Sequence, residues 1–349
     1  MTSVSDSPTE QASPTTHSPV TPTIGFDVDG LHTGHLQLPH SHDGSAYGSV
    51  MIPVAVIKNG DGPTVLLTGG NHGDEYQGPL ALFRLVSSID VADVTGRIIV
   101  VPTMNQPAFA AGTRTSPIDN GNLNRSFPGR PDGTVTEKIA DYMARYMLPM
   151  ADLVVDMHDG GKTLEFVPMA CTHVLDDKDA EARGWRFAKA FKAPFTCKLV
   201  AIDTIGLWDT HVENSGTPFI TTELGGTGTT RPDWAEIALR GVRNVLKEAG
   251  VLAGDHEDAP TEFLDVPLEG AYITSESDGL IEWVVALGDP IERGQVIARV
   301  HDPRHLGRAP AEYRATMDGI LAMRHFPGLV RMDDAIAMQG TIVDGDSLE

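Results

Sequence analysis

The chain has 349 residues, of which 41% are hydrophobic and 21% charged, values that suit about two folded domains. Its 26 basic and 48 acidic side chains give a net charge of -22, which repels nucleic acid and anionic lipid and excludes both as expected partners. The acidic excess fits a salt-rich cytoplasm, as in a halophile, and fits an ordinary acidic enzyme equally well.

The cysteine content and the N-terminus indicate the compartment. Only Cys171 and Cys197 are present, too few for a disulfide framework, which favours a reducing, cytoplasmic location. The first residues lack a basic start followed by an apolar run, and no stretch of about 18 apolar residues occurs. We therefore expect neither export nor membrane insertion.

Taken in chain order, the sequence begins with residues rich in Ser, Thr and Pro, which predict a disordered tail. From residue 48 onwards, apolar strands alternate with amphipathic helices. A capping box at Thr134 and Glu137 begins one helix, and Gly250 ends the last. The alternation predicts a mostly parallel sheet with helices on both faces. Strands are predicted at 49–57, 64–70, 97–105, 151–159 and 218–224, and helices at 78–88, 138–150, 179–191 and 232–249.

The sequence pattern changes after Gly250, where the alternation of strands and helices ends. A polar, linker-like segment is followed by short, glycine-punctuated stretches of β character without a helical period. The predicted organisation is therefore a disordered tail at 1–23, an α/β catalytic domain at 24–254 and a smaller all-β domain at 262–346.

The first candidate site residues are His72 and Glu75, which follow the strand at 64–70. At the start of a helix, this spacing places the two side chains on one side, about 5–6 Å apart at Cβ. Imidazole nitrogen and carboxylate oxygen are both zinc ligands. The pair alone is weak evidence, because a solvated pair at a helix start is the commoner explanation.

Two further strands end in polar residues. His158 follows apolar strand residues and precedes Asp159 and two glycines, and Glu223 stands before another pair of glycines. Open α/β sheets place their sites at the carboxyl ends of strands. A core histidine bonded to backbone would also explain His158, whereas a carboxylate placed at Glu223 for packing alone would be costly. Three such strand ends together favour one shared site.

A long, turn-rich stretch at 112–134 carries Arg114, Asn124 and Arg125. Its Gly, Asn and Pro content is explained by turns without any function. Arginine beside small polar residues is nevertheless typical of carboxylate binding, because the guanidinium fork matches a carboxylate.

The motifs NHGDE, NLNRSFPG, a strand ending in His158, and TTELGG occur in this order. In this combination the sequence resembles the succinylglutamate desuccinylase and aspartoacylase family, relatives of the zinc carboxypeptidases, over roughly residues 48–250 and the β domain. The stretches GTRTSPIDNGNLNRSFPGRPDGTVTEKIAD and RHFPGLV look like the branch that deacetylates N-alpha-acetyl-L-2,4-diaminobutyrate in ectoine degradation. The resemblance implies a zinc-carboxypeptidase-like, mostly parallel or mixed sheet flanked by helices.

The resemblance also implies a mechanism, in which His72, Glu75 and His158 would hold one Zn²⁺ per chain. A metal with an open coordination position is what zinc hydrolases use. Glu223 would act as general base and would later return the proton to the departing amine.

For the substrate, the resemblance implies that Arg114 would help stabilise the oxyanion, while Asn124 and Arg125 would hold the α-carboxylate. Asp159 stands where the family resemblance leads us to expect Ser, so substrate preference could differ at this position. The free ammonium of a diaminobutyrate substrate needs a nearby acid, for which Asp159 and Glu165 are candidates.

Alternative functions remain open at this stage. An aspartoacylase- or succinylglutamate desuccinylase-type deacylase, or a carboxypeptidase, would use the same metal and base, although a surface at -22 disfavours strongly anionic substrates. A catalytically silent metal-binding or ligand-sensing module would lack the base, yet Glu223 is present. We expect a small N-acyl amino acid as the partner, and a homodimer is compatible with this reading.

Overall fold

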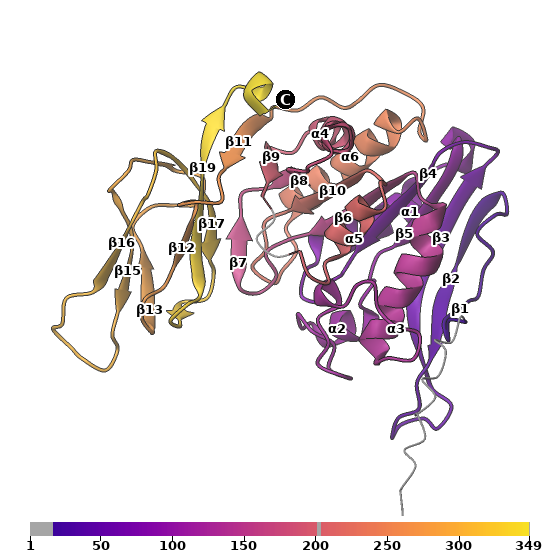
Figure 1. Ribbon diagram of the computed structural model, residues 1–349, viewed down its shortest axis with the longest axis horizontal. Coiled ribbons are helices and arrows are strands. Elements are labelled where there is room, and N and C mark those ends of the chain that lie inside the picture. The colour runs from indigo at the N-terminus through magenta and orange to yellow at the C-terminus, as the bar shows by residue number, and fades with distance from the viewer. Residues whose placement is uncertain (1–16, 201–203, 349) are drawn as a thin grey trace, which may run out of the picture.

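The computed structural model describes residues 17–200 and 204–348 (Figure 1). The strands of its N-terminal region are β1 (Thr21–Pro22), β2 (Gly30–Pro39), β3 (Ser49–Asn59), β4 (Thr64–Gly69), β5 (Gly96–Val101), β6 (Leu153–His158), β7 (Leu164–Phe166), β8 (Met169–His173), β9 (Phe195–Leu199) and β10 (Phe219–Glu223). The main sheet begins with the order β1-β2-β3-β5-β4-β6-β10-β8-β9.

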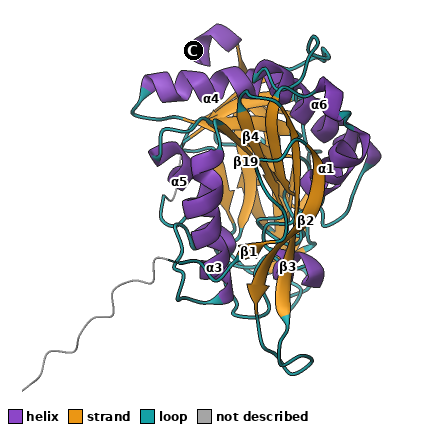
Figure 2. Ribbon diagram, turned by 90° about the vertical axis from the view of Figure 1, so that its right-hand side faces the viewer, coloured by secondary structure: helices purple, strands orange, loops and turns teal. Residues whose placement is uncertain are grey.

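Helices cover both faces of this sheet (Figure 2). The α-helices are α1 (Gln77–Ser88), α2 (Gln106–Ala111), α3 (Val135–Tyr142), α4 (Lys178–Phe191), α5 (Trp208–Asn214) and α6 (Pro232–Glu248). A π-helical turn, η3 (Met143–Met147), continues α3, and the 3₁₀ turns are η1 (Val91–Asp93), η2 (Leu123–Arg125), η4 (Leu148–Met150) and η5 (Gly345–Leu348).

The alternation of side chains along the buried strands explains the two layers of helices. On β4, Val65 and Leu67 pack into a core shared with α1, α4 and α6. Leu66 points to the opposite face, into a core shared with α3 and α5. Because successive strand residues face opposite sides of a sheet, a continuous apolar run is what a strand buried on both faces requires.

The centre of the sheet is parallel, and an antiparallel pairing borders it on each side. Strand β4 pairs in parallel with β5 and β6, and β6 pairs in parallel with β10. By contrast, β2, β3 and β5 form an antiparallel run, and β8 is antiparallel to β10. The prediction of a mixed sheet flanked by helices is confirmed, and its parallel centre brings the carboxyl ends of β4, β6 and β10 together.

The C-terminal region extends this sheet and adds a second one. Its strands are β11 (Glu262–Val266), β12 (Tyr272–Thr274), β13 (Gly279–Trp283), β14 (Pro290–Ile291), β15 (Val296–His301), β16 (Ala311–Arg314), β17 (Gly319–His325), β18 (Leu329–Val330) and β19 (Ala335–Val343). Strand β11 pairs in parallel with β9, and β17 pairs with β7. The order β16-β15-β13-β18 forms a separate antiparallel sheet, at the left of Figure 1. The β region thus begins at the predicted position but continues the main sheet.

The predicted disordered tail at 1–23 is wrong for residues 18–22, and residues 1–16 lie outside the described part of the chain. Ser18 and Val20 are buried, and β1 pairs with β2. The Val20 side chain joins the same apolar core as Leu36, so burial of this valine adds to the strand pairing that holds the segment.

The predicted strands and helices are otherwise close to those observed. The capping box at Thr134 and Glu137 is confirmed at the start of α3. Before the β region, the structure adds β1, β2, β7, β8, β9, α2 and α5, which were not predicted. None of the helices in residues 17–200 and 204–348 combines the length and apolar character that crossing a bilayer requires.

Gly78 lets α1 lie directly on β6. A Cβ atom at this position would stand 2.6 Å from the Met157 Cβ and 2.7 Å from its carbonyl oxygen. We expect Gly78→Ala to lower the free energy of unfolding by about 1–3 kcal/mol through overpacking, despite the better helix propensity of alanine. Ser87→Ala, on the exposed side of the same helix, should be nearly neutral in urea denaturation. Stabilisation by Gly78→Ala would contradict this packing.

Candidate active site

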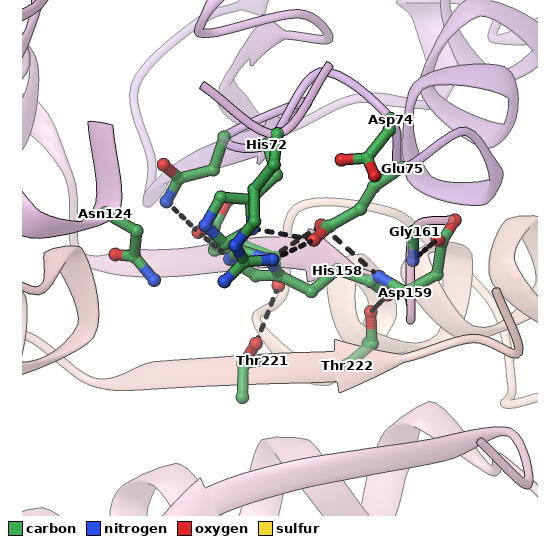
Figure 3. Close-up of polar contacts among 12 residues, drawn as sticks. His72, Asp74, Glu75, Asn124, His158, Asp159, Gly161, Thr221 and Thr222 are labelled. Carbon is green, nitrogen blue, oxygen red and sulfur yellow. Dashed lines mark hydrogen bonds and ion pairs between the residues drawn. The ribbon is translucent and has the colours of Figure 1, made fainter. Parts of the chain in front are cut away.

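The side chains of His72, Glu75 and His158 meet at the carboxyl edge of the parallel strands (Figure 3). His72 and Glu75 lie in the loop between β4 and α1, and His158 is the last residue of β6. One Glu75 oxygen lies 2.6 Å from His72 Nδ1, and the other lies 2.8 Å from His158 Nδ1. A single carboxylate therefore contacts both imidazoles.

Asp156 fixes the orientation of the His158 ring. Asp156 and His158 are two residues apart on β6, so their side chains lie on the same face of the sheet. Asp156 Oδ2 lies 2.8 Å from His158 Nε2, and Thr68 and Asn71 donate hydrogen bonds to the same carboxylate at 2.6 and 3.1 Å. A hydrogen bond from Nε2–H to Asp156 would leave Nδ1, beside Glu75, as the metal-binding nitrogen of His158, which is how such an outer carboxylate orients a histidine ligand.

Burial and charge shift the pKa values of this cluster strongly. Burial raises the pKa of Glu75, but attraction by His72 and His158 outweighs burial and holds it well below its usual range. Burial lowers the pKa of His158, but Glu75 and Asp156 raise it well above its usual value. Burial lowers the pKa of His72. Two buried carboxylates around these imidazoles create a site that favours positive charge.

The donor set fits a metal ion. The ligand atoms of His72, Glu75 and His158 lie within 4.8 Å of one another, and among the described residues no other group of His, Cys, Asp and Glu converges in this way. Two imidazole nitrogens and one carboxylate oxygen are the ligand combination of a catalytic zinc site, which keeps a fourth position for water. Asp156 supplies the outer hydrogen bond that such a histidine ligand needs.

Glu223 lies beside this cluster because β10 pairs with β6 in a register that sets Glu223 against His158. Its Oε2 atom is buried and has no hydrogen-bond partner among the described residues. Burial, together with repulsion from Glu75, raises the pKa of Glu223 to about 8, although His158 opposes the shift. A carboxyl group near its pKa at neutral pH can both take and return a proton.

The glycines after β6 and β10 allow these two strand ends to pack closely. Gly160 donates its N–H to the carbonyl oxygen of Gly225 at 3.1 Å. Gly226 has a φ of 143°, and a Cβ there would lie 2.2 Å from the Leu164 carbonyl oxygen and 2.8 Å from the Gly160 Cα. Side chains at these positions would push His158 and Glu223 apart.

A cavity of about 390 Å³ opens over the cluster, a size suited to a small molecule. Of the predicted site residues, the structure brings all to its wall except the more deeply buried Glu75 and the alternative acid Glu165. The predicted residues that line it are His72, Arg114, Asn124, Arg125, His158, Asp159 and Glu223.

Three polar residues from the long loop, Arg114, Asn124 and Arg125, line the cavity. Arg114 is half exposed, and its Nη1 lies 3.7 Å from a Glu75 oxygen. Arg125 donates a hydrogen bond to the Asn124 backbone carbonyl at 2.6 Å. Asn124 Oδ1 accepts the Trp208 backbone N–H at 2.9 Å, which ties η2 to α5.

Asp159 lies in the cavity wall, but the backbone of α1 engages its carboxylate. Its Oδ2 accepts N–H bonds from Tyr76 and Gln77 at 2.8 and 3.0 Å, and its Oδ1 accepts from Gly161 at 2.8 Å. Burial and the nearby Glu75 raise the pKa of Asp159 to about 7. Asp159 therefore joins the start of α1 to the end of β6, and its role in substrate binding stays a prediction.

Glu165 lies on β7 and forms an ion pair with the C-terminal region. Arg324 on β17 contacts one of its oxygens through Nε at 2.8 Å and Nη2 at 2.6 Å. This pair fastens the cavity wall at Leu164 and Phe166 to the C-terminal sheet. The Glu165 carboxylate thus already has a cationic partner within the protein.

Residues 61–249 match the model of the succinylglutamate desuccinylase/aspartoacylase catalytic domain. The chain belongs to the succinylglutamate desuccinylase/aspartoacylase family. The motifs that indicated this family in the sequence are the segments that build the cavity.

Members of this family cover nearly the whole chain. The N-alpha-acetyl-L-2,4-diaminobutyric acid deacetylase of Halomonas elongata is 53% identical over 94% of this chain and 96% of its own length. The product-bound ectoine utilization protein EutE (DoeB) of Ruegeria pomeroyi is 54% identical, with a TM-score of 0.92 over 93% of this chain and 99% of that structure. A succinylglutamate desuccinylase from Silicibacter sp. TM1040 is 52% identical, with a TM-score of 0.91 over 94% and 99%.

Tyr272, His173 and Asp209 also line the cavity of this chain, and the sequence alone did not identify them as site residues. Tyr272 comes from β12 of the C-terminal region, and His173 and Asp209 come from β8 and α5. No local motif marks them, because β8 and α5 are short and their pairing partners lie far away in sequence. The short, largely apolar run that ends in His173 was the available signal.

His173 provides a test of the electrostatics around the cavity. Its Nδ1 lies 2.9 Å from Glu213 Oε1. Burial lowers the pKa of His173, but the hydrogen bond and charge of Glu213 outweigh burial and raise it. Because the pKa of His173 is higher in the folded state, protonated His173 stabilises the fold. This contribution is complete below the unfolded-state pKa of about 6.5 and is lost as the pH rises through the folded-state pKa.

We therefore expect part of the unfolding free energy to disappear as the pH rises above about 6.5, the unfolded-state pKa of histidine, and Glu213→Gln to reduce that pH-dependent part. Urea denaturation at several pH values measures both. An equal loss in the wild type and in Glu213→Gln would show that the His173–Glu213 pair does not cause it.

Proposed function

We propose that this chain hydrolyses the amide of N-alpha-acetyl-L-2,4-diaminobutyrate to L-2,4-diaminobutyrate and acetate, as a step of ectoine degradation. The observation that carries the proposal is its 53% identity, over 94% of the chain, to the Halomonas elongata relative of that name. The cavity supports it, because a metal-type cluster, a buried carboxyl group and carboxylate-binding side chains face one small space.

Zinc is the proposed cofactor, one ion per chain, with His72, Glu75 and His158 as its ligands. When bound, zinc would lower the pKa of a water molecule and polarise the amide carbonyl. The contact of Asp156 with His158 Nε2 keeps the ligand ring in place before and after the reaction.

Glu223 is the proposed general base. Its buried Oε2 accepts a proton from the attacking water as the oxygen forms a bond to the carbonyl carbon. The same carboxyl group then donates that proton to the substrate nitrogen, so the C–N bond breaks to give acetate and a free amine. The raised pKa of Glu223 favours this return of the proton.

Asn124 and Arg125 are proposed to bind the α-carboxylate of the substrate. Arg114 is proposed to stabilise the negative charge that develops on the carbonyl oxygen during attack. Because Asn124 Oδ1 accepts the Trp208 N–H, its amide group is held in one orientation with the NH₂ as the donor for a carboxylate. Arg114 lies close enough to Glu75 to reach the reacting carbonyl.

Succinylglutamate desuccinylation is a second candidate, favoured by the 52% identical structure of that name and by the two arginines of the cavity. The net charge of -22 opposes it, because the substrate is multiply anionic. A silent sensing module has less support, since it would lack the base and the buried Glu223 is retained. A carboxypeptidase would use the same metal and base, and it has less support because the relatives that match the chain are named as a deacetylase and a desuccinylase. The cytoplasmic location and the homodimer stay predictions.

Substrate preference tests the proposal directly. We expect zinc-loaded protein to release amine from N-alpha-acetyl-L-2,4-diaminobutyrate with a higher kcat/KM than from N-acetylaspartate, succinylglutamate or a blocked dipeptide. Free amine is recorded for all four at matched concentrations. Preference for succinylglutamate would keep the hydrolase and replace the substrate.

Glu223→Gln tests the base. Because glutamine keeps the shape but cannot accept the proton, we expect kcat to fall by about 10²–10⁴-fold, the range typical of a lost general base. Zinc content, measured by mass spectrometry, should stay at one ion per chain, whereas His158→Ala should lose the ion. Turnover near the wild-type rate in zinc-loaded Glu223→Gln would assign the base elsewhere.

A further inference from the structure

A second group of charged side chains borders the cavity away from Glu223. His173 stacks on Phe219, which stands four residues before Glu223 on β10, or about 13 Å along the strand. Its Nδ1 lies 2.9 Å from Glu213, and its Nε2 lies 3.8 Å from Asp209 Oδ2. His173 and Asp209 both line the cavity.

We propose that Asp209 binds the side-chain ammonium of the substrate and thereby selects a diamino acid. The inference rests on the proposed function, because the acetylated α-nitrogen of that substrate is neutral and the C4 amine is its one positive charge. An ammonium that enters a cavity loses water, so it needs an anionic partner there.

The other described acids of the cavity wall are already engaged. Asp156 contacts His158 and accepts hydrogen bonds from an asparagine and a threonine. Asp159 accepts three backbone N–H bonds. Glu223 is the proposed base and must keep its carboxylate for the reacting water. Glu165, the remaining acid considered from the sequence, is paired with Arg324.

Asp209 differs from these acids in the contacts of its two oxygens. Its Oδ1 accepts hydrogen bonds from the backbone N–H and the hydroxyl of Thr210, which fix the side-chain orientation. The contact of Oδ2 with His173 is 3.8 Å, longer than a hydrogen bond. The side chain is 18% exposed, so an ammonium would meet a carboxylate that is partly shielded from water.

The position of Asp209 relative to Asn124 suits a short diamino acid. Trp208, the residue before Asp209, donates its N–H to Asn124 Oδ1 at 2.9 Å, so the proposed carboxylate ligand and Asp209 are held in one rigid unit. In 2,4-diaminobutyrate two methylenes separate the ammonium from the α-carbon. A substrate whose α-carboxylate is bound at Asn124 therefore places its side chain near the start of α5.

The charge of the group also fits a cation. Glu213 and Asp209 flank the single imidazole of His173, so two carboxylates leave a net negative charge even when His173 is protonated. The same charge would repel the second carboxylate of N-acetylaspartate. The cluster of Asp209, Glu213 and His173 therefore attracts the diamino substrate and disfavours binding of anionic analogues.

The test compares wild type with Asp209→Asn on two acetylated substrates of equal length. One is N-alpha-acetyl-L-2,4-diaminobutyrate, and the other is N-acetyl-L-norvaline, which has a methyl group in place of the ammonium. Asparagine keeps an oxygen to accept from Thr210, so the variant is expected to fold. Asp179→Asn, an exposed acid in the first turn of α4, is the matched control.

We expect Asp209→Asn to raise KM for the diamino substrate by about 10-fold or more, as for a lost charged hydrogen bond, with kcat little changed. KM for acetylnorvaline should stay the same or fall, and Asp179→Asn should change neither. Calorimetry with L-2,4-diaminobutyrate and L-norvaline should show the same contrast in binding, independently of turnover.

Equal losses on both substrates would show that Asp209 only supports α5, and unchanged diaminobutyrate kinetics and binding would show that the ammonium lies elsewhere. Either result overturns the inference while the proposed function stands. If the wild type itself prefers N-acetylaspartate or succinylglutamate, the proposed function fails first, and the assignment of Asp209 falls with it.

Discussion

The contact of one carboxylate, that of Glu75, with the imidazoles of both His72 and His158 is the interaction on which the site depends. All three groups are almost completely withdrawn from water, so each requires the charge of the others. Asp156 adds a second negative charge behind His158. A cation between these donors would balance the excess of negative charge, and the fold holds the donor side chains close enough together to bind one.

The sheet supplies this geometry through its parallel centre. Neighbouring strands that run in one direction deliver their carboxyl-terminal residues to one edge, and glycines at the turns allow the edge to close around His158 and Glu223. The C-terminal strands complete the cavity, because β17 holds β7 and β12 contributes Tyr272. The β region is therefore part of the active-site wall as well as an appended sheet.

The sequence predicted the elements whose signals are local. The apolar run of β4, the capping box at Thr134 and the ordered motifs that contain His72, His158 and Glu223 each stand within a few residues. The cavity residues from β8, β12 and α5 could not be predicted in this way, because only contacts between segments far apart in the sequence bring them to the site. Short segments such as β1 pair with distant strands over only two residues, which is too short for a periodic signal.

Anomalous diffraction at the zinc absorption edge from zinc-loaded crystals tests the central claim most directly. The account predicts one peak for each chain, at about 2.0–2.2 Å from a nitrogen of His72, a nitrogen of His158 and an oxygen of Glu75, with Glu223 beside it but not bound. A peak at any other group of side chains, or zinc-loaded crystals without a peak at these three residues, would contradict the account.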